Sequence, residues 1–290
     1  MKTRYLLTII LAASMALPVA GMAQHPIFET VNNALAAEGH DNLQLAVVEW
    51  ITASDEAGQT VFFNNRGNKQ LAHHWVPNDP SNGNGTVLPW AIDSVDVTGD
   101  VLPGADFAAI MASMQTWQNQ NCSFIPLVDL GLIPFDYGVV QNILGFGGTP
   151  GFFPFLTHAG FLPGAFFDAV TPGGSTFILG ATFTFVWISP ADLDNNGKAD
   201  TALREIYYND AFLWGDGTGG SIDIETVSLH EVGHGLSQGH FGKLARTDRN
   251  GKFHFAPRAV MNAGYTGVQR SVTGTDNGGH CSIWGSWPNN

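Results

Sequence analysis

One stretch, residues 222–240, limits what this chain can fold into more than any other. It contains three histidines and a glutamate in the order H-E-x-x-H-x-x-x-x-x-H. Residues four apart lie on the same face of a helix, so His230 and His234 can both direct a ring nitrogen at one metal ion. His240 reaches the same ion only if the helix ends and the chain turns back. Two glycines nearby can adopt the backbone angles that such a turn requires.

Three imidazoles around zinc leave a fourth position for water, which is the arrangement of a catalytic rather than a structural site. The metal lowers the pKa of that water, and Glu231 can take its proton and pass it to a leaving amine. A lone H-E-x-x-H also occurs by chance on solvated helices, so the third histidine adds weight to this interpretation. No Glu follows Glu231 in the chain, which favours His240 as the third ligand over Asp248 and Asp276.

These residues resemble the metzincin family of zinc metalloproteases, and most closely its matrixin branch, in which H-E-x-x-H-x-x-G-x-x-H precedes a methionine turn. Met261, in A-V-M-N-A-G-Y, takes the place of the Met-turn residue. The closing stretch that begins at Asp276 is similar to the D-x-x-G-x-x-x-L-Y-G ending of matrixin catalytic domains. Tyr265 follows the Met turn, and we expect it to line the pocket or to stabilise the oxyanion.

The chain departs from the family at two points. Ser237 stands where the family has a glycine, and the left-handed conformation of that glycine would cost a serine roughly 1–2 kcal/mol. No PRCGxPD-like motif is present, so a latency mechanism with a thiol on zinc is not supported.

The resemblance implies an α/β (α+β) fold. We expect a metzincin-like catalytic domain with a twisted mixed sheet, a backing helix, an active-site helix, the Met turn and a C-terminal helix. The implied function is a secreted zinc-dependent endopeptidase that uses a zinc-bound water activated by Glu231. One alternative is a secreted metal-binding adhesion or partner-binding protein with the same fold and no turnover. Another is a hydrolase of non-peptide amides.

Residues 1–23 have the features of a secretory signal peptide, with Lys2 and Arg4 before an apolar run and small residues up to Ala23. The protein is therefore expected to be secreted or periplasmic. Residues 24–70 are an N-terminal segment, either a propeptide or the first strands of the catalytic domain, with a helix in 25–42 and strands at 45–52 and 60–63. The catalytic domain is assigned to residues 71–290.

Acidic residues outnumber basic ones by 25 to 12, which argues against nucleic acid and anionic membranes as partners. No stretch after the signal is apolar and long enough to span a bilayer. We therefore expect a monomer whose partner is a protein or peptide substrate. The two cysteines, Cys122 and Cys281, are expected to form a disulfide in an oxidising compartment, the alternative being two buried thiols.

Residues 132–176 are rich in Gly, Pro and Phe and almost free of charge. We interpret them as an insertion in the catalytic domain. It could supply apolar substrate contacts or bind a partner, but an irregular and partly buried excursion is favoured because long uncharged loops rarely stay exposed.

Residues 192–200 place oxygen-bearing side chains and a glycine at the steps of a calcium-binding loop. The EF-hand's closing Glu is missing, and an ordinary Asn/Asp/Gly turn has the same composition. His73 and His74 are expected not to bind metal, since adjacent strand residues point to opposite faces. The proposed Ca²⁺ ligands are Asp192, Asp194, Asn196, Asp200 and the carbonyl of Lys198.

A helix is predicted after Pro103, with an apolar stripe that includes Ile110, Met114 and Trp117. Strands are predicted at 175–188 and 204–209. The second of these, just before the zinc helix, is expected to lie near the cleft, where an extended peptide can add as a further strand. Asp223 is the expected N-cap of the zinc helix.

Overall fold

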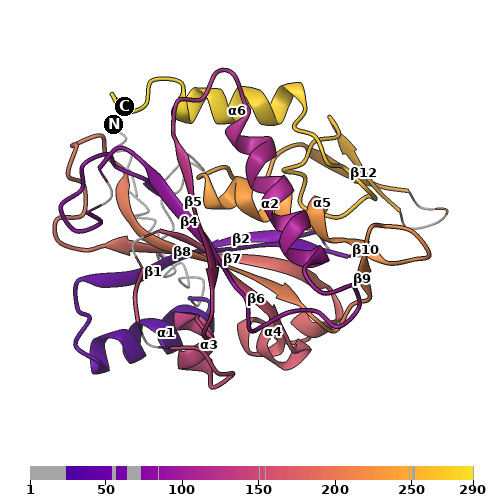
Figure 1. The fold of residues 1–290 in the computed structure, drawn as a ribbon, viewed down its shortest axis with the longest axis horizontal. Helices are drawn as coiled ribbons and strands as arrows, with labels where there is room; N and C mark the ends of the chain where they lie inside the picture. The colour runs from indigo at the N-terminus through magenta and orange to yellow at the C-terminus, as the bar shows by residue number, and fades with distance from the viewer. Residues whose placement is uncertain are drawn as a thin grey trace, which may run out of the picture.

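The structure, a computed structural model, describes residues 24–289 except 54–56, 64–72, 84, 150, 154, 248, 250 and 251. The predicted signal peptide, residues 1–23, therefore lies outside the described residues. A mixed sheet of eight strands runs through the middle of the molecule, in the order β2-β1-β7-β8-β6-β4-β5, with β3 paired to β8 (Figure 1). Its strands are β1 (Leu43–Thr52), β2 (Gln59–Phe62), β3 (His73–His74), β4 (Leu88–Asp93), β5 (Leu127–Ile133), β6 (Leu156–Leu162), β7 (Ile178–Trp187) and β8 (Ala199–Asn209).

Four neighbouring strands of this sheet, β5, β4, β6 and β8, are parallel, and β7 runs antiparallel to β8. β1 pairs antiparallel with β7, and β2 pairs antiparallel with β1. Every residue of β4 and β6 is buried, as are nearly all of β7 and β8. Strands covered on both faces tend to be apolar along their whole length, but β8 also carries buried polar side chains, among them Arg204 and Glu205. The chain thus has the mixed α/β architecture that the sequence predicts.

Six α-helices of the described residues cover the two faces of the sheet (Figure 1). One face carries α2, α5 and α6, and the other carries α1, α3 and α4. Each layer has its own apolar core, the first around Trp117 and Trp284 and the second around Phe28 and Phe166. The helices are α1 (Pro26–Ala37), α2 (Ala105–Gln118), α3 (Val139–Leu144), α4 (Gly164–Val170), α5 (Ile224–Gly235) and α6 (Gly274–Trp284).

α2 is the helix predicted after Pro103, and it lies against α5. Ile110, Met114 and Trp117 are buried along its predicted stripe. Trp117 also donates a hydrogen bond from Nε1 to the carbonyl of Leu229 in α5 at 2.8 Å. This contact fixes the position of α5 along α2. α5 is the helix that carries the H-E-x-x-H motif.

The Gly- and Phe-rich residues 132–176 are not a peripheral insertion. They contain β6, which lies between β8 and β4 in the sheet, together with α3 and α4. Phe166 and Phe167 are fully buried in the core beneath the sheet. The stretch lacks charge because it builds a central strand and one apolar layer, so the expectation of an irregular excursion is corrected.

The strand predicted at 204–209 is the end of β8, and it is not near a free edge. β8 is hydrogen-bonded to β7 on one side and to β6 on the other, so no peptide can add to it. The outer side of β7 is in turn covered by β1 from the N-terminal segment. The sequence could not show this, because strand order depends on contacts between distant residues.

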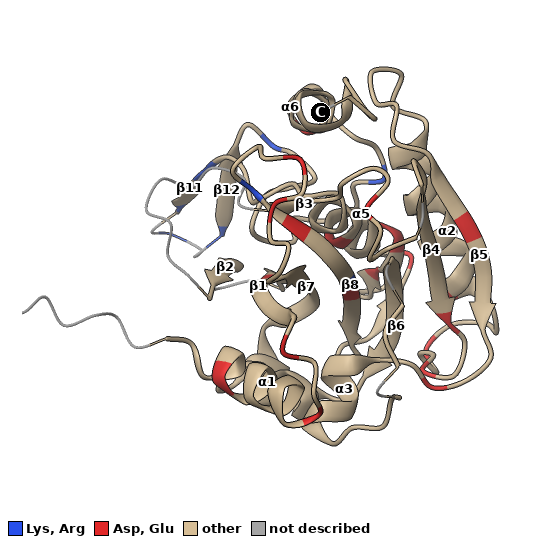
Figure 2. Ribbon diagram, turned by 90° about the vertical axis from the view of Figure 1, so that its left-hand side faces the viewer, with Lys and Arg blue, Asp and Glu red and all other residues tan. Residues whose placement is uncertain are grey.

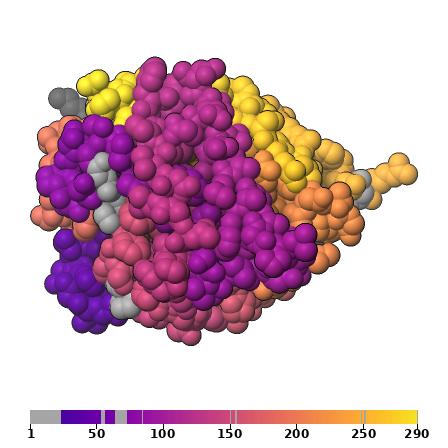
Figure 3. Space-filling view, viewed as in Figure 1, coloured from indigo at the N-terminus to yellow at the C-terminus, as the bar shows by residue number. Residues whose placement is uncertain are grey.

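Three features outside the sheet complete the fold. A disulfide joins Cys122 to Cys281, with their Cα atoms 5.2 Å apart, and ties the end of α2 to α6. A small hairpin of β11 (Lys243–Arg246) and β12 (Phe253–Ala256) projects from the body (Figure 3). Lys and Arg, blue in the ribbon of Figure 2, gather on and beside this hairpin, whereas Asp and Glu, in red, are spread over the rest of the molecule. Another short pair, β9 (Trp214–Gly215) and β10 (Ile222–Asp223), leads into α5. Within the described ranges, none of the helices has the length and apolarity needed to cross a membrane.

Candidate metal centre

The three histidines of the motif meet at one point. The Nε2 atoms of His230 and His234 lie 3.0 Å apart, and each lies 3.3 Å from Nε2 of His240. Nitrogens bound to zinc at about 2.0–2.1 Å in tetrahedral geometry would lie about 3.3–3.4 Å apart. The spacing of the three nitrogens therefore fits a single metal ion of this size.

α5, which carries His230 and His234, has its start fixed by a side chain. Asp223 is the N-cap, and its carboxylate accepts a hydrogen bond from the backbone nitrogen of Thr226 at 2.8 Å. Every residue of the helix except Glu225 is buried, and His230, Glu231 and His234 have no exposed surface. Burial on all sides leaves the rings one orientation each.

The turn after α5 brings His240 back to the other two histidines. Ser237 adopts the left-handed conformation, with φ of 67°, and its hydroxyl accepts a hydrogen bond from Nη2 of Arg204 at 2.8 Å. The other guanidinium nitrogen, Nη1, donates to the carbonyl of Gly235 at 2.5 Å. The indole nitrogen of Trp75 also donates a hydrogen bond to the carbonyl of Gly235, and that of Trp284 donates one to the carbonyl of Leu236, both at 2.9 Å. The last carbonyls of α5 are thus capped by side chains, and the serine gains a partner that offsets its backbone strain.

Each histidine is oriented through its other ring nitrogen. Nδ1 of His230 lies 2.7 Å from the carbonyl oxygen of Val260, and Nδ1 of His234 lies 2.7 Å from that of Gln238. A carbonyl only accepts hydrogen bonds, so these contacts place the proton on Nδ1 and leave Nε2 free as a ligand. Nδ1 of His240 contacts the hydroxyl of Thr60 at 3.3 Å.

Met261 lies directly against α5. Its sulfur packs on Gly233, where a Cβ atom would collide with it. Asp276, at the start of α6, accepts hydrogen bonds from the backbone nitrogens of Val260 and Met261, both at 3.0 Å. Asp276 thus holds the methionine turn to α6 and does not act as a ligand. Asp248 lies outside the described residues.

Glu231 has both carboxylate oxygens engaged by strands. Oε2 accepts a hydrogen bond from the hydroxyl of Thr182 in β7 at 2.6 Å, and Oε1 accepts one from the backbone nitrogen of Ile51 in β1 at 3.3 Å. Burial raises the pKa of Glu231 to about 7. Tyr265, which was expected to line the pocket or to stabilise the oxyanion, lies instead at the start of α5. Its hydroxyl accepts a hydrogen bond there from the backbone nitrogen of Asp223 at 3.2 Å.

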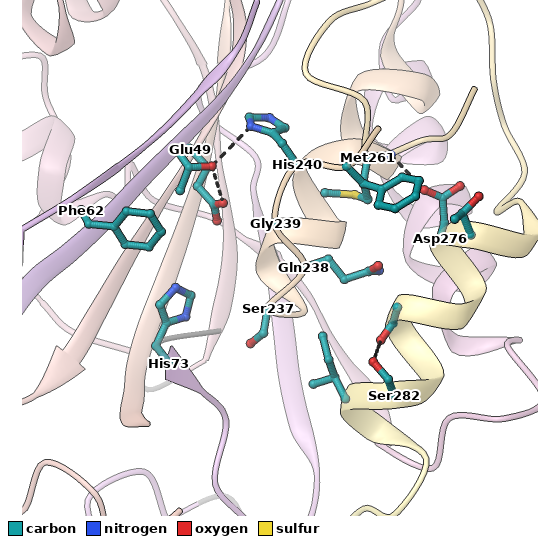
Figure 4. Close-up of a pocket in the computed structure, with 15 residues that line it drawn as sticks. Glu49, Phe62, His73, Ser237, Gln238, Gly239, His240, Met261, Asp276 and Ser282 are labelled. Atoms are coloured by element: carbon teal, nitrogen blue, oxygen red, sulfur yellow. Dashed lines mark hydrogen bonds between the residues drawn. The ribbon is translucent and has the colours of Figure 1, made fainter. Parts of the chain in front are cut away.

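Glu49 is a site residue that the sequence reasoning missed. It is only 3% exposed, and its Oε2 lies 3.3 Å from Nδ1 of His234. Its Oε1 accepts a hydrogen bond from Thr60 at 3.0 Å, and Thr60 contacts His240 in turn (Figure 4). Burial alone would raise the pKa of Glu49, but the neighbouring histidines, His234 first and then His240 and His73, together outweigh it and lower the pKa to about 2. The one available signal was an isolated acid in the apolar run of β1.

A pocket of about 600 Å³ opens beside the histidines, between the β1–β2 pair and α6 (Figure 4). His240 and Met261 line it, but His230, Glu231 and His234 do not. Other lining residues include Glu49, Thr60, Phe62, His73, Gln238 and Ile283.

The predicted calcium loop contributes to a second group of metal-binding side chains. Nε2 of His74 lies 3.5 Å from Oδ2 of Asp194. One possible ligand atom from each of His74, Asp194 and Asp200 lies within 4.8 Å of the other two. His74 and Asp200 are each only 1% exposed, and Oδ1 of Asp200 has no hydrogen-bond partner. Asp192 instead closes the turn, since its carboxylate accepts hydrogen bonds from the backbone nitrogens of Asn196 and Gly197.

The rings of His73 and His74 do point apart, as strand geometry requires. Nδ1 of His73 accepts a hydrogen bond from Nη2 of Arg204 at 2.6 Å, on the side of the histidine site. His74 faces the 192–200 loop, where the side-chain amide of Asn196 contacts its Nε2 at 2.5 Å. His74 thus lies in a group of side chains that could hold a metal ion, and the expectation that it binds none stays a prediction. The backbone nitrogen of Lys198 donates a hydrogen bond to Oδ1 of Asn196 at 2.9 Å.

A third group consists of three carboxylates at the ends of β4 and β5. Nε2 of Gln141 donates hydrogen bonds to Asp96 at 2.6 Å and to Asp136 at 2.8 Å. Asp93 is fully buried and accepts a hydrogen bond from the backbone nitrogen of Tyr137 at 2.5 Å. Burial, together with the neighbouring carboxylates, raises the pKa of Asp96 to about 6.

No protein-family model matches the chain, and no curated protein matches it.

Proposed function

We propose that the chain is a zinc-dependent endopeptidase of the metzincin kind, exported by the signal in residues 1–23. The observation that supports this best is the triangle of Nε2 atoms, 3.0–3.3 Å on a side, with Glu231 next to His230 in the same buried helix. Three imidazoles with an adjacent carboxylate are the donor set of a catalytic zinc site.

The residues present fit zinc better than calcium at this position. Neutral imidazole nitrogens suit zinc, whereas calcium takes oxygen ligands. When bound, zinc would supply a water of lowered pKa and polarise the scissile carbonyl. His230, His234 and His240 would hold the ion, and Val260, Gln238 and Thr60 would keep the three rings in place.

Glu231 is the residue that we propose to move protons. Its carboxylate would take a proton from the attacking water and return it to the nitrogen of the leaving amine. The hydroxyl of Thr182, 2.6 Å from Oε2, holds the carboxylate in one orientation. Thr182 lies in β7, the strand beside which a peptide substrate would have to pass.

At the 192–200 loop we propose a second bound cation, with His74, Asp194 and Asp200 as ligands in place of the all-oxygen calcium set. A nitrogen ligand favours zinc over calcium. The unpartnered Oδ1 of Asp200, in a residue that is 1% exposed, is a polar atom that a cation would satisfy.

The alternative function is a secreted metal-binding protein without turnover. The complete burial of Glu231 beneath β1 and β7 favours it, because no substrate reaches the carboxylate in this conformation. A cleavage assay separates the two functions. The zinc-loaded chain should hydrolyse casein or a quenched-fluorescence peptide and stop when a chelator removes the metal. A metal-loaded chain that cleaves none of a broad set of peptides would favour the binding protein.

A further inference from the structure

The N-terminal strand β1 passes directly over the proposed general base. It pairs antiparallel with β7, with Trp50 opposite Ala181 and Ile51 opposite Gly180. At this point the backbone nitrogen of Ile51 donates a hydrogen bond to Oε1 of Glu231 at 3.3 Å. The carboxylate is therefore bound to a main-chain N–H of the chain's own strand.

The same strand is held from its other end by the segment after Met261. The carbonyl of Thr52 accepts a hydrogen bond from the nitrogen of Tyr265 at 2.8 Å, and the nitrogen of Gly58 donates to the carbonyl of Ala263 at 2.7 Å. β1 thus lies beside β7, passes Glu231 and ends, at Thr52, against the segment that follows Met261.

This is the path that the proposed reaction requires of a substrate. A general base that returns its proton to a leaving amine must lie within hydrogen-bond reach of a backbone nitrogen of the peptide. The nitrogen of Ile51 meets that condition. An extended peptide would bind here by main-chain hydrogen bonds to β7, as an added antiparallel strand.

Nothing else can occupy this path while β1 is in place. His230, Glu231 and His234 have no exposed surface, and the neighbouring pocket reaches only His240 among the three histidines. The β1–β2 pair is also tied to the histidines, by Glu49 to His234 and by Thr60 to His240.

We propose that β1, residues 43–52, is an intramolecular occupant of the peptide-binding edge of β7, and that it must leave β7 before an extended polypeptide can bind. The proposal rests on the proposed endopeptidase function and gives it a form of latency without a thiol. The chain's own strand acts as a bound, uncleaved peptide and is exchanged for the substrate.

A reversible lock tests this on the full chain. Gln44 and Val186 lie opposite each other in the β1–β7 register, far along the strand from Ile51. Opposite residues of antiparallel strands have Cα atoms about 4.5–5.5 Å apart, within the range that a disulfide spans. We expect the oxidised Gln44→Cys/Val186→Cys protein to cleave peptide, and to bind a peptide hydroxamate, at least tenfold more slowly than the same protein after reduction. Wild type under the same reductant controls for opening of the Cys122–Cys281 bond.

A loosening variant tests the opposite direction. The side chain of Asn32 in α1 accepts a hydrogen bond from the nitrogen of Leu45 at 2.7 Å and donates one to its carbonyl at 3.2 Å, which anchors β1 far from the histidines. Asn32→Ala should raise the cleavage rate severalfold, whereas Asn33→Ala, at the exposed neighbouring position, should not.

An oxidised lock that cleaves as fast as its reduced form would overturn the proposal. Another outcome would contradict the proposed endopeptidase function itself, and this inference with it. It is that the zinc-loaded locked, reduced and Asn32→Ala proteins all retain the metal but neither cleave peptide nor bind the hydroxamate.

Discussion

The carboxylate of Glu49 lies 3.3 Å from Nδ1 of His234, the ring nitrogen that faces away from the other two histidines. A carboxylate in this position orients an imidazole and strengthens it as a metal ligand. We therefore predict that Glu49→Gln weakens zinc binding by about 10- to 100-fold, the effect typical of such residues. Competition with a chromophoric chelator measures this. Glu38→Gln, at an exposed position, is the matched control, and equal affinities of the two variants would contradict the role given to Glu49.

The serine of the turn after α5 gives a stability prediction. Any residue but glycine pays about 1–2 kcal/mol for the left-handed conformation at position 237. Ser237→Ala keeps this cost and loses the hydrogen bond from Arg204, whereas Ser237→Gly loses the bond but removes the cost. The glycine variant should therefore unfold with a free energy about 1–2 kcal/mol higher than the alanine variant. Urea denaturation decides the order, and an alanine variant at least as stable as the glycine variant would disprove it.

Metal counting tests the two sites separately. We predict two equivalents of zinc in the wild-type chain, one in a His230→Ala/His234→Ala variant and one in His74→Gln. Excess calcium should displace neither ion, because both sites include nitrogen ligands. His254→Gln changes an exposed histidine and should leave two equivalents. A wild-type chain with a single equivalent, lost from the His230 variant, would leave the His74 group without a cation.

Asp96 makes stability depend on pH in a defined direction. Its pKa is raised from 3.8 to about 6 in the folded protein, so the charged form is disfavoured by folding. Asp96→Asn should raise the free energy of unfolding by about 1–2 kcal/mol at pH 7, after allowance for partial exposure. The difference should shrink as the pH falls through about 6 and vanish below about 4, where Asp96 is protonated in both states. Denaturation at pH 7 and at pH 4 measures it, with exposed Asp41→Asn as control. A gain that is the same at both pH values would rule out the charge as its cause.

Local patterns in the sequence were enough to predict the centre of this site. The i, i+4 spacing placed His230 and His234 on one helix, and the glycines near His240 indicated the turn. Asp223 was recognisable as an N-cap because capping depends on a few neighbouring residues. The apolar stripe of α2 was likewise readable from its period.

Contacts between distant segments could not be read in this way. β1 pairs with β7, more than a hundred residues away, and so covers Glu231 and brings Glu49 to His234. His74 meets Asp194 and Asp200 through the parallel β3–β8 pairing. Residues 132–176, which carry few charges, were read as an irregular excursion because a central parallel strand has no alternation of polar and apolar residues.

The central claim is that three histidines hold one zinc ion while Glu231 transfers protons. Its most direct test compares Glu231→Gln with the unsubstituted chain, in wild type and in the loosened Asn32→Ala background, for both zinc content and peptide cleavage. We predict that Glu231→Gln keeps the zinc of the histidine site and cleaves at least about 100-fold more slowly, the lower range for loss of a general base. A Glu231→Gln protein that cleaves at the unsubstituted rate would contradict the account.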